Sequence, residues 1–180
     1  MSTDSETREA NRLAALESLH VLDSTAEKDY DDLTRIAAQI CGTPVSAIAL
    51  VDVERQWFKS KVGIDASETP REFSFCAHAI QRPEEVMVVG DASKDERFMD
   101  NPFVTATNGV RFYAGAPLVT TSGHAVGALC VADWRPGGID AAQVDLLQFL
   151  AQQVVCQLEI RAEALLDARA TLNQIVALAE

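Results

Sequence analysis

Long apolar runs are missing from this chain of 180 residues. No stretch approaches the roughly 18 consecutive apolar residues that a membrane helix needs, so we expect no membrane partner. The opening residues, MSTDSETREANR, are polar and lack the apolar centre of a secretory signal. These absences predict a cytoplasmic protein.

Cationic residues are also scarce. The chain has 15 Lys and Arg against 27 Asp and Glu, which gives a formal net charge of −12. A surface with this balance repels the phosphate backbone of nucleic acids. We therefore expect no nucleic-acid partner.

Closely spaced cysteine pairs are absent as well. The four cysteines, Cys41, Cys76, Cys130 and Cys156, are scattered and form no CxxC pair. This spacing excludes the disulfide framework of small secreted proteins and the paired ligands of structural zinc sites. We predict reduced thiols and no metal site.

With 48% hydrophobic residues and no internal repeat, the chain has enough apolar residues to form the core of one globular domain.

The segment from Arg111 to Trp134 is the most informative feature that is present. It predicts two strands joined by a polar turn at 121–123, and both strands are rich in small residues. Glycine inside a strand gives up side-chain packing, so Gly115 and Gly127 indicate a close neighbour. Tight packing of the protein on itself and the approach of a ligand both satisfy this pattern.

The remaining periodicities predict helices around an antiparallel sheet. Residues 4–22 and a segment that starts after Thr25 and ends at Gly42 have helical spacing. Val45–Val53 and Gln56–Val62 form a second hairpin, whose first strand is apolar throughout and should be central. Another helix runs from Asp140 to the end. Hairpins in the middle and helices at both ends predict an α+β domain with helices packed on one face of the sheet.

Residues 63–108 hold less regular structure. We expect a short helix near 74–81, a strand over 85–91 and a turn of helix at 94–99. Loops held over a rigid sheet are frequent positions for binding sites. This segment is therefore the first place to look for a ligand.

Six segments together carry a resemblance to a known family. In order they are RLAALESLHVLDST, IALVDVERQWFKS, ETPREFSFCAHAI, VVGDASKDERFMDNPFV, RFYAGAPL and GALCVAD. The chain closely resembles the GAF sensory domains of bacterial signalling proteins, particularly those placed before histidine kinases or GGDEF-type cyclases. The resemblance implies a six-stranded antiparallel sheet, with helices from both chain ends on one face and a small-molecule pocket on the other. Residues 1–139 then form the sensory domain and residues 140–180 a signalling helix.

The resemblance implies no particular ligand, and the cofactor stays unknown. The cyclic-nucleotide motif of this fold has a different residue order from its nearest match here, Lys94-Asp95-Glu96-Arg97-Phe98. Bilin binders usually have an adjacent Cys and His, whereas Ala77 separates Cys76 from His78 in this chain. Our candidate ligand-binding residues combine thiols, charges and aromatic rings that the loops and the hairpin from Arg111 to Trp134 supply. They are Cys76, His78, Asp91, Asp95, Arg97, Phe98, Phe112, Tyr113 and Cys130.

Each candidate also has a structural explanation. Free cysteines often pack as small hydrophobic residues, and Asp95 with Arg97 has the spacing of a local cap that pins a loop. Phe112 and Tyr113 point to opposite faces of one strand, and the sequence does not tell which face lines the pocket. Aromatic side chains of the protein itself can fill the pocket in place of a ligand. They are Trp57, Phe58, Phe98 and Phe103.

Catalysis has one candidate in this fold. Free methionine sulfoxide reductases share this fold and use cysteines for catalysis. The cysteine-bearing segment characteristic of those enzymes is not found in this sequence, so we predict no catalytic residue and no enzyme activity.

The terminal helix carries an independent signal. Apolar residues recur at alternating intervals of three and four, and only Arg161 interrupts them. This spacing favours a coiled coil and a homodimer formed through the C-terminal helix. The seam consists of Val144, Leu147, Ala151, Val154, Leu158, Arg161, Leu165, Ala168, Leu172, Ile175 and Ala179. Three functions remain: a sensor that passes a small-molecule or redox signal to this helix, the reductase, and a pairing module without a ligand.

Overall fold

The computed structural model describes residues 3–179, and their strands form one antiparallel sheet in the order β3-β2-β1-β6-β5-β4. The elements are α1 (Thr3–Ser18), α2 (Lys28–Cys41), β1 (Val45–Val51), β2 (Arg55–Val62), β3 (Glu68–Pro70), η1 (Arg71–Phe73), α3 (Phe75–Ala79), β4 (Met87–Val89), η2 (Ala92–Lys94), α4 (Pro102–Thr105), β5 (Phe112–Val119), β6 (Ala125–Asp133) and α5 (Ala141–Ala179). The sheet and its helices confirm the predicted α+β fold.

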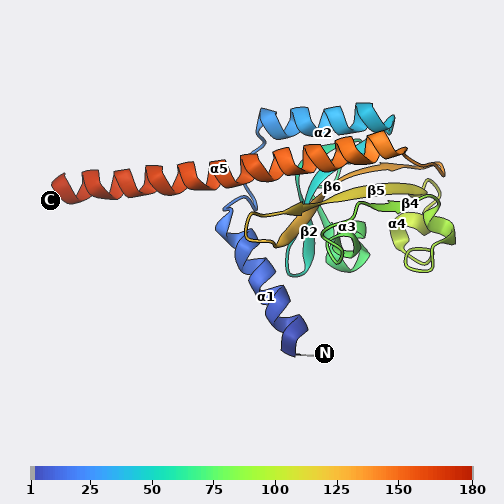
Figure 1. The fold of residues 1–180 in the computed structure, drawn as a ribbon, viewed down its shortest axis with the longest axis horizontal. Helices are drawn as coiled ribbons and strands as arrows, with labels where there is room; N and C mark the ends of the chain where they lie inside the picture. Colours follow the sequence, from blue (N-terminus) through green and yellow to red (C-terminus); the bar gives the residue numbers. More distant parts are fainter. Residues whose placement is uncertain (1–2, 180) are drawn as a thin grey trace.

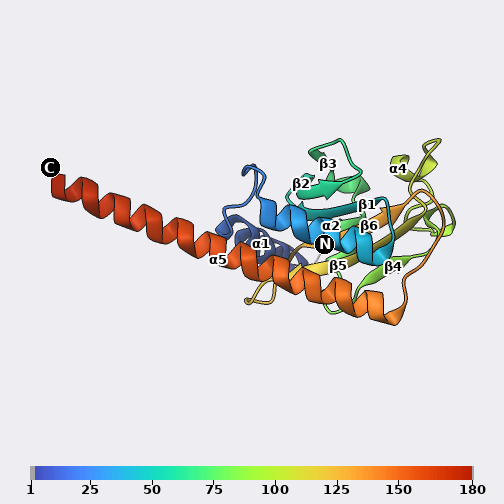
Figure 2. The same cartoon turned by 90° about the horizontal axis from the view of Figure 1, so that it is seen from above.

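The sheet separates two layers. Helices α2 and α5 lie side by side over one face, while α3, α4 and their loops lie over the other (Figures 1 and 2). The central strand β1 is buried along its whole length, as its continuous apolar sequence predicts. The two faces therefore support two separate apolar clusters, which we name the helix-side cluster and the loop-side cluster.

The helix-side cluster is larger and includes Leu16 and Leu19 from the N-terminal segment and Leu147 and Leu158 from α5. The loop-side cluster contains Phe58, Phe75, Cys76, Phe98, Tyr113 and Cys130, together with alanines from the central strands. Apolar residues thus fill both faces of the sheet.

The two strand glycines accommodate the protein's own atoms. A Cβ atom on Gly127 would lie 2.0 Å from the carbonyl oxygen of Ala49 in β1. A Cβ atom on Gly115 would lie 2.2 Å from the hydroxyl of Tyr113, whose side chain folds over it. Tight packing therefore accounts for both glycines.

Helix boundaries differ from the expectation at α1, which ends at Ser18 and not at Leu22, and at α2. Helix α2 begins at Lys28 with Glu27 as its N-cap, two residues later than the expected start after Thr25, and ends at Cys41 with Gly42 as its C-cap in the left-handed conformation, with φ of 63°. The predicted turn of helix at 94–99 overlaps the end of η2 at Lys94 and is present as a single turn, in which the N–H of Met99 donates to the carbonyl of Asp95 at 2.8 Å. The short elements β3 and α4 were not predicted, since three or four residues carry too little periodicity.

Helix α5 has two different halves. Asp140 accepts a hydrogen bond from the backbone N–H of Gln143 and the Gln143 side chain bonds back, which is a reciprocal cap. The helix packs on the sheet as far as Ala162, and every described side chain from 163 to 178 is exposed. Figure 1 shows this second half projecting away from the domain. Within residues 3–179, no helix is long and apolar enough to cross a membrane.

Candidate functional site

Helix α3 forms the roof over the loop-side face. Its N-cap, Ser74, accepts a hydrogen bond from the N–H of Ala77 at 2.9 Å and donates one to the Gln56 side chain of β2. The side chain of Asn101 donates to the carbonyl of Phe73 at 2.9 Å. The roof is thus bonded to the sheet on one side and to the loop before α4 on the other.

Aromatic rings occupy the space beneath the roof. Phe75 stacks on Phe98 with 4.1 Å between ring centroids, and its ring lies 5.0 Å from that of Tyr113. The imidazole of His78 meets Phe98 edge-on at 4.8 Å. Where the family resemblance implies a pocket, the protein's own side chains fill the face.

Three polar groups are enclosed within this apolar layer. The hydroxyl of Tyr113 donates a hydrogen bond to Sγ of Cys76 at 3.2 Å. Cys130 pairs with Gly115 in the sheet, and it interacts with Cys76. Hydrogen bonds from Cys130 and from Tyr113 lower the pKa of the Cys76 thiol. The pKa of the Cys130 thiol is raised, because Cys130 interacts with Cys76 and is buried. Burial also raises the pKa of Tyr113.

The charged candidates form local structure at the rim. Asp95 accepts from the backbone N–H of Arg97 and binds its guanidinium through both carboxylate oxygens. Asp91 caps η2 by accepting from Ser93. These contacts are those of loop-pinning residues, and a hydrogen bond from Arg97 lowers the pKa of Asp95.

An open cavity of about 510 Å³ lies beside the roof, at the β4 edge of the sheet. Its lining combines the two arginines Arg82 and Arg97 with Glu85 and the apolar side chain of Met87. His78 also lines it, and burial lowers the pKa of its imidazole, which favours the neutral form. Of the candidate residues, His78 and Arg97 line this cavity.

The structure brings together most, but not all, of the candidates. Five candidates share the loop-side face and two more lie at its rim. Those on the face are Cys76, His78, Phe98, Tyr113 and Cys130, and those at the rim are Asp95 and Arg97. Phe112 lies in the helix-side cluster, on the opposite face of β5. Of the four aromatic residues that were expected to fill the pocket, Phe58 and Phe98 belong to the loop-side cluster. Trp57 belongs to the helix-side cluster, and Phe103 is exposed.

A metal ion has no evident place in this layer. Within the described part of the chain, no three His, Cys, Asp or Glu side chains come together as ligands.

An ionic cluster that the sequence did not reveal connects the sheet to α5. The Lys59 side chain of β2 is completely buried and binds Glu27, the hydroxyl of Ser24 and the carbonyl of Thr25. Arg161 of α5 binds Glu27 at 2.9 Å and the carbonyl of His20 at 2.9 Å. The residue that interrupts the apolar seam thus fastens α5 to the domain.

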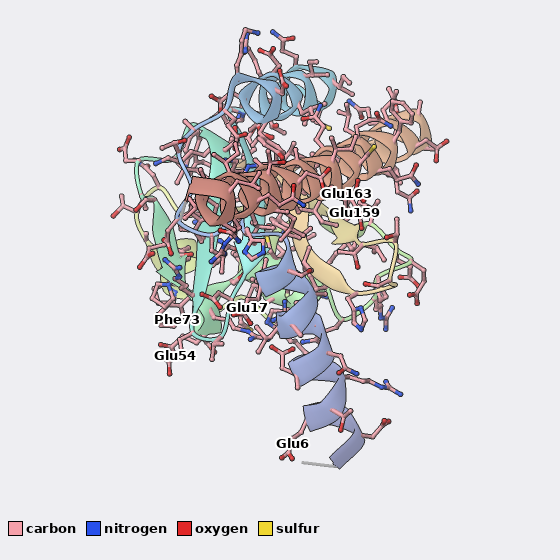
Figure 3. The ribbon with its side chains drawn as sticks, turned by 90° about the vertical axis from the view of Figure 1, so that its left-hand side faces the viewer. Glu6, Glu17, Glu54, Phe73, Glu159 and Glu163 are labelled. Atoms are coloured by element: carbon pink, nitrogen blue, oxygen red, sulfur yellow. The ribbon has the colours of Figure 1, made fainter. Side chains whose placement is uncertain are left out.

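A second contact fastens α5 at nearly the same level. Glu159 accepts hydrogen bonds from the backbone N–H and the hydroxyl of Thr121, both at 2.9 Å. In Figure 3, Glu159 lies on α5 beside the turn between β5 and β6. The helix is therefore held on both sides immediately before its exposed half begins.

Comparison with known proteins assigns this fold. The family model described as GAF domain matches residues 26–158. A cyclic di-GMP phosphodiesterase of Pseudomonas aeruginosa is 38% identical over 151 residues, which are 83% of this chain and 26% of that protein. The chain thus spans about a quarter of the length of this curated relative.

Two solved structures share the architecture. The GAF domain of an Acinetobacter phosphoenolpyruvate-protein phosphotransferase has a TM-score of 0.62 at 20% identity, covering 91% of this chain and 97% of that one. The free methionine-R-sulfoxide reductase of Neisseria meningitidis, solved with its substrate, has a TM-score of 0.61 at 18% identity, covering 91% and 95%. At these identities the likeness shows the fold alone.

Proposed function

Because the chain belongs to the GAF domain family, we propose that it is a non-catalytic regulatory domain that passes a signal from the loop-side face to a dimeric C-terminal helix. The observation that carries this proposal is the position of Glu27, which binds Lys59 of the sheet and Arg161 of α5 at once. A change in the sheet that moves Lys59 alters the anchor of α5. Such coupling requires two states that differ in their affinity for the signal.

The signal enters at the cavity beside the roof. His78 and Arg97 line it, and both touch Phe98, which fills the loop-side face. A small molecule in this cavity therefore contacts residues that support the aromatic layer. The opposing charges of Arg82 and Glu85 favour a polar ligand with both donor and acceptor groups.

The output is the exposed half of α5. The seam from Leu147 to Leu158 is buried against the domain itself, so only its later part is available to a second copy. Leu165, Leu172 and Ile175 are 44%, 60% and 59% exposed. Apolar residues at this spacing on a projecting helix favour a homodimer. The curated relative is a cyclic di-GMP phosphodiesterase and the match covers 26% of it, so we propose that this domain regulates such an output without performing it.

Ligand screening tests the sensor against the pairing module. Thermal-shift measurements with a panel of nucleotides and polar metabolites should give a specific stabilisation, and native mass spectrometry should show the bound mass. Arg97→Ala should abolish the shift, whereas Arg135→Ala, an exposed arginine outside the cavity, should retain it. No shift and no bound mass across the panel would leave a pairing module.

The reductase remains a second candidate because a free methionine-R-sulfoxide reductase shares the fold. Cys76 is only 1% exposed and is not among the residues that line the cavity, which disfavours attack on a bound sulfoxide. Incubation with free methionine sulfoxide and a thioredoxin system should yield no methionine. Turnover that disappears in Cys76→Ser or Cys130→Ser would establish the reductase instead.

A further inference from the structure

Two thiols and a phenol meet beneath α3, and no step of the proposed function uses them. Tyr113 lies over Gly115, and Cys130 is the cross-strand partner of that glycine. The Tyr113 hydroxyl also reaches Sγ of Cys76 at 3.2 Å. Three elements, α3, β5 and β6, thus deliver their side chains to one point.

We propose that Cys76 and Cys130 are a redox modification site that a peroxide converts into a disulfide. The bond joins the roof to a central strand of the sheet, so oxidation locks α3 in place. The two cysteines lie on the same face of the sheet as the proposed ligand cavity. Formation of the disulfide between them requires neither a bound ligand nor a dimer.

The chemistry balances with one peroxide per dithiol. The Cys76 sulfur attacks a peroxide oxygen, the O–O bond breaks, and the leaving hydroxide or alkoxide takes the Cys76 proton, which gives a sulfenic acid. The Cys130 sulfur then attacks the Cys76 sulfur, the S–O bond breaks, and the leaving hydroxide takes the Cys130 proton as water. Both sulfurs are oxidised by one electron each and the peroxide is reduced by two. A dithiol reductant reverses the change by exchange.

Tyr113 acts as a positioning residue for this reaction. Its hydroxyl donates to the sulfur of Cys76, and a donor at that atom favours the nucleophilic thiolate. Its ring also packs on Phe75, so Tyr113→Phe removes the donor and keeps the packing. We therefore assign the first attack to Cys76 and the resolving step to Cys130.

Burial controls the rate. Cys76 and Cys130 are 1% and 7% exposed, so a peroxide reaches them when α3 opens locally. This helix has five residues and depends on the Ser74 cap. Weakening that cap should accelerate oxidation.

The experiment uses the full chain with Cys156→Ser, which removes the exposed thiol. After treatment with hydrogen peroxide, alkylation without reduction and peptide mass mapping, we expect a loss of two hydrogens and a linked pair of peptides containing Cys76 and Cys130. Cys41 is the internal control and should stay reduced, because it lies in the helix-side cluster, away from the two loop-side thiols, and burial raises the pKa of its thiol. Separate oxidation of Cys76 and Cys130 to sulfinic acids, or two thiols that stay reduced, would overturn the proposal.

Two further variants separate this site from simple packing. Tyr113→Phe should slow disulfide formation by about two- to tenfold, as expected for one lost hydrogen bond, and should shift its pH profile upward. Ser74→Ala should accelerate it at unchanged pH profile. Equal rates in all three proteins would show that neither the phenol nor the roof governs the thiols, and would remove both assignments.

Discussion

Lys59 of β2 and Arg161 of α5 bind the same oxygen, Oε2, of Glu27. Glu27 is the N-cap residue of α2, so the three side chains link the sheet and both helices of the helix side. Lys59 also lies over the ring of Tyr30 at 5.0 Å. A buried lysine is stable only with such partners, because an isolated charge in an apolar interior is strongly disfavoured.

Replacing Glu27 by Gln should therefore destabilise the domain by about 1–3 kcal/mol, since Lys59 loses its counter-charge while remaining buried. Urea unfolding followed by circular dichroism measures this loss. Glu68→Gln is the matched control, because Arg55 keeps Asp23 and Asp52 as partners, and it should cost less than about 0.5 kcal/mol. Equal losses in the two variants would contradict the role of Glu27.

A second prediction concerns acid stability. Hydrogen bonds from Arg12, and further interactions with Arg71, lower the pKa of Glu9 from 4.5 to about 2. Because the pKa is lower in the folded state, the stabilisation is present above pH 4.5 and is lost as the pH falls towards 2. The stability difference between the unsubstituted protein and Glu9→Gln should shrink accordingly between pH 6 and pH 3.

Urea unfolding at several pH values checks this prediction. Glu17→Gln, a substitution of an exposed carboxylate on the same helix, provides the control and should show no comparable change over that range. A difference for Glu9→Gln that stays constant down to pH 3 would mean that the Arg12 and Arg71 contacts do not form in solution.

Gly127 tests the close approach of β6 to β1. In Gly127→Ala the new Cβ atom would meet the carbonyl oxygen of Ala49 at 2.0 Å, and backbone in the middle of a sheet cannot easily move away. We expect a loss of about 3 kcal/mol by chemical unfolding. Gly138→Ala, where no atom lies within 4 Å of the new methyl group, should stay within about 0.5 kcal/mol of the parent.

The sequence predicted features that depend on local spacing. Period-two and period-3.6 patterns placed both hairpins and α5, and Gly127 indicated a close neighbour before that neighbour was known. The Asp95 and Arg97 pair also has a local origin, since the capping bond spans only two residues. Such features require no knowledge of distant parts of the chain.

The remaining features arise from contacts between distant segments. Lys59 and Glu27 are separated by 32 positions, and Arg161 and Glu27 by 134, so no spacing rule relates them. Phe112 and Tyr113 were left unassigned because both faces of β5 are buried, and a strand without a polar face gives no indication of its orientation. Arg161 was visible only as an interruption of the seam. Its explanation required the position of Glu27.

The exposed half of α5 provides the test of dimerisation. Leu165→Glu with Leu172→Glu places two carboxylates on the apolar seam, where a partner helix would bury them, so we expect a dimer to dissociate into monomers. Light scattering at micromolar concentration measures the change in mass. Both side chains are exposed within one chain, so the fold of the domain should be retained.

Ala164→Glu with Ala170→Glu is the matched control, because it adds the same two charges to exposed positions of the same helix that lie off the seam. This variant should keep the mass of the parent protein. If the parent is a monomer, or if the seam and control variants dissociate equally, the seam does not form the contact. In that case the output of α5 would have to be a change in its attachment at Arg161 and Glu159, which Glu27→Gln would alter without any change in mass.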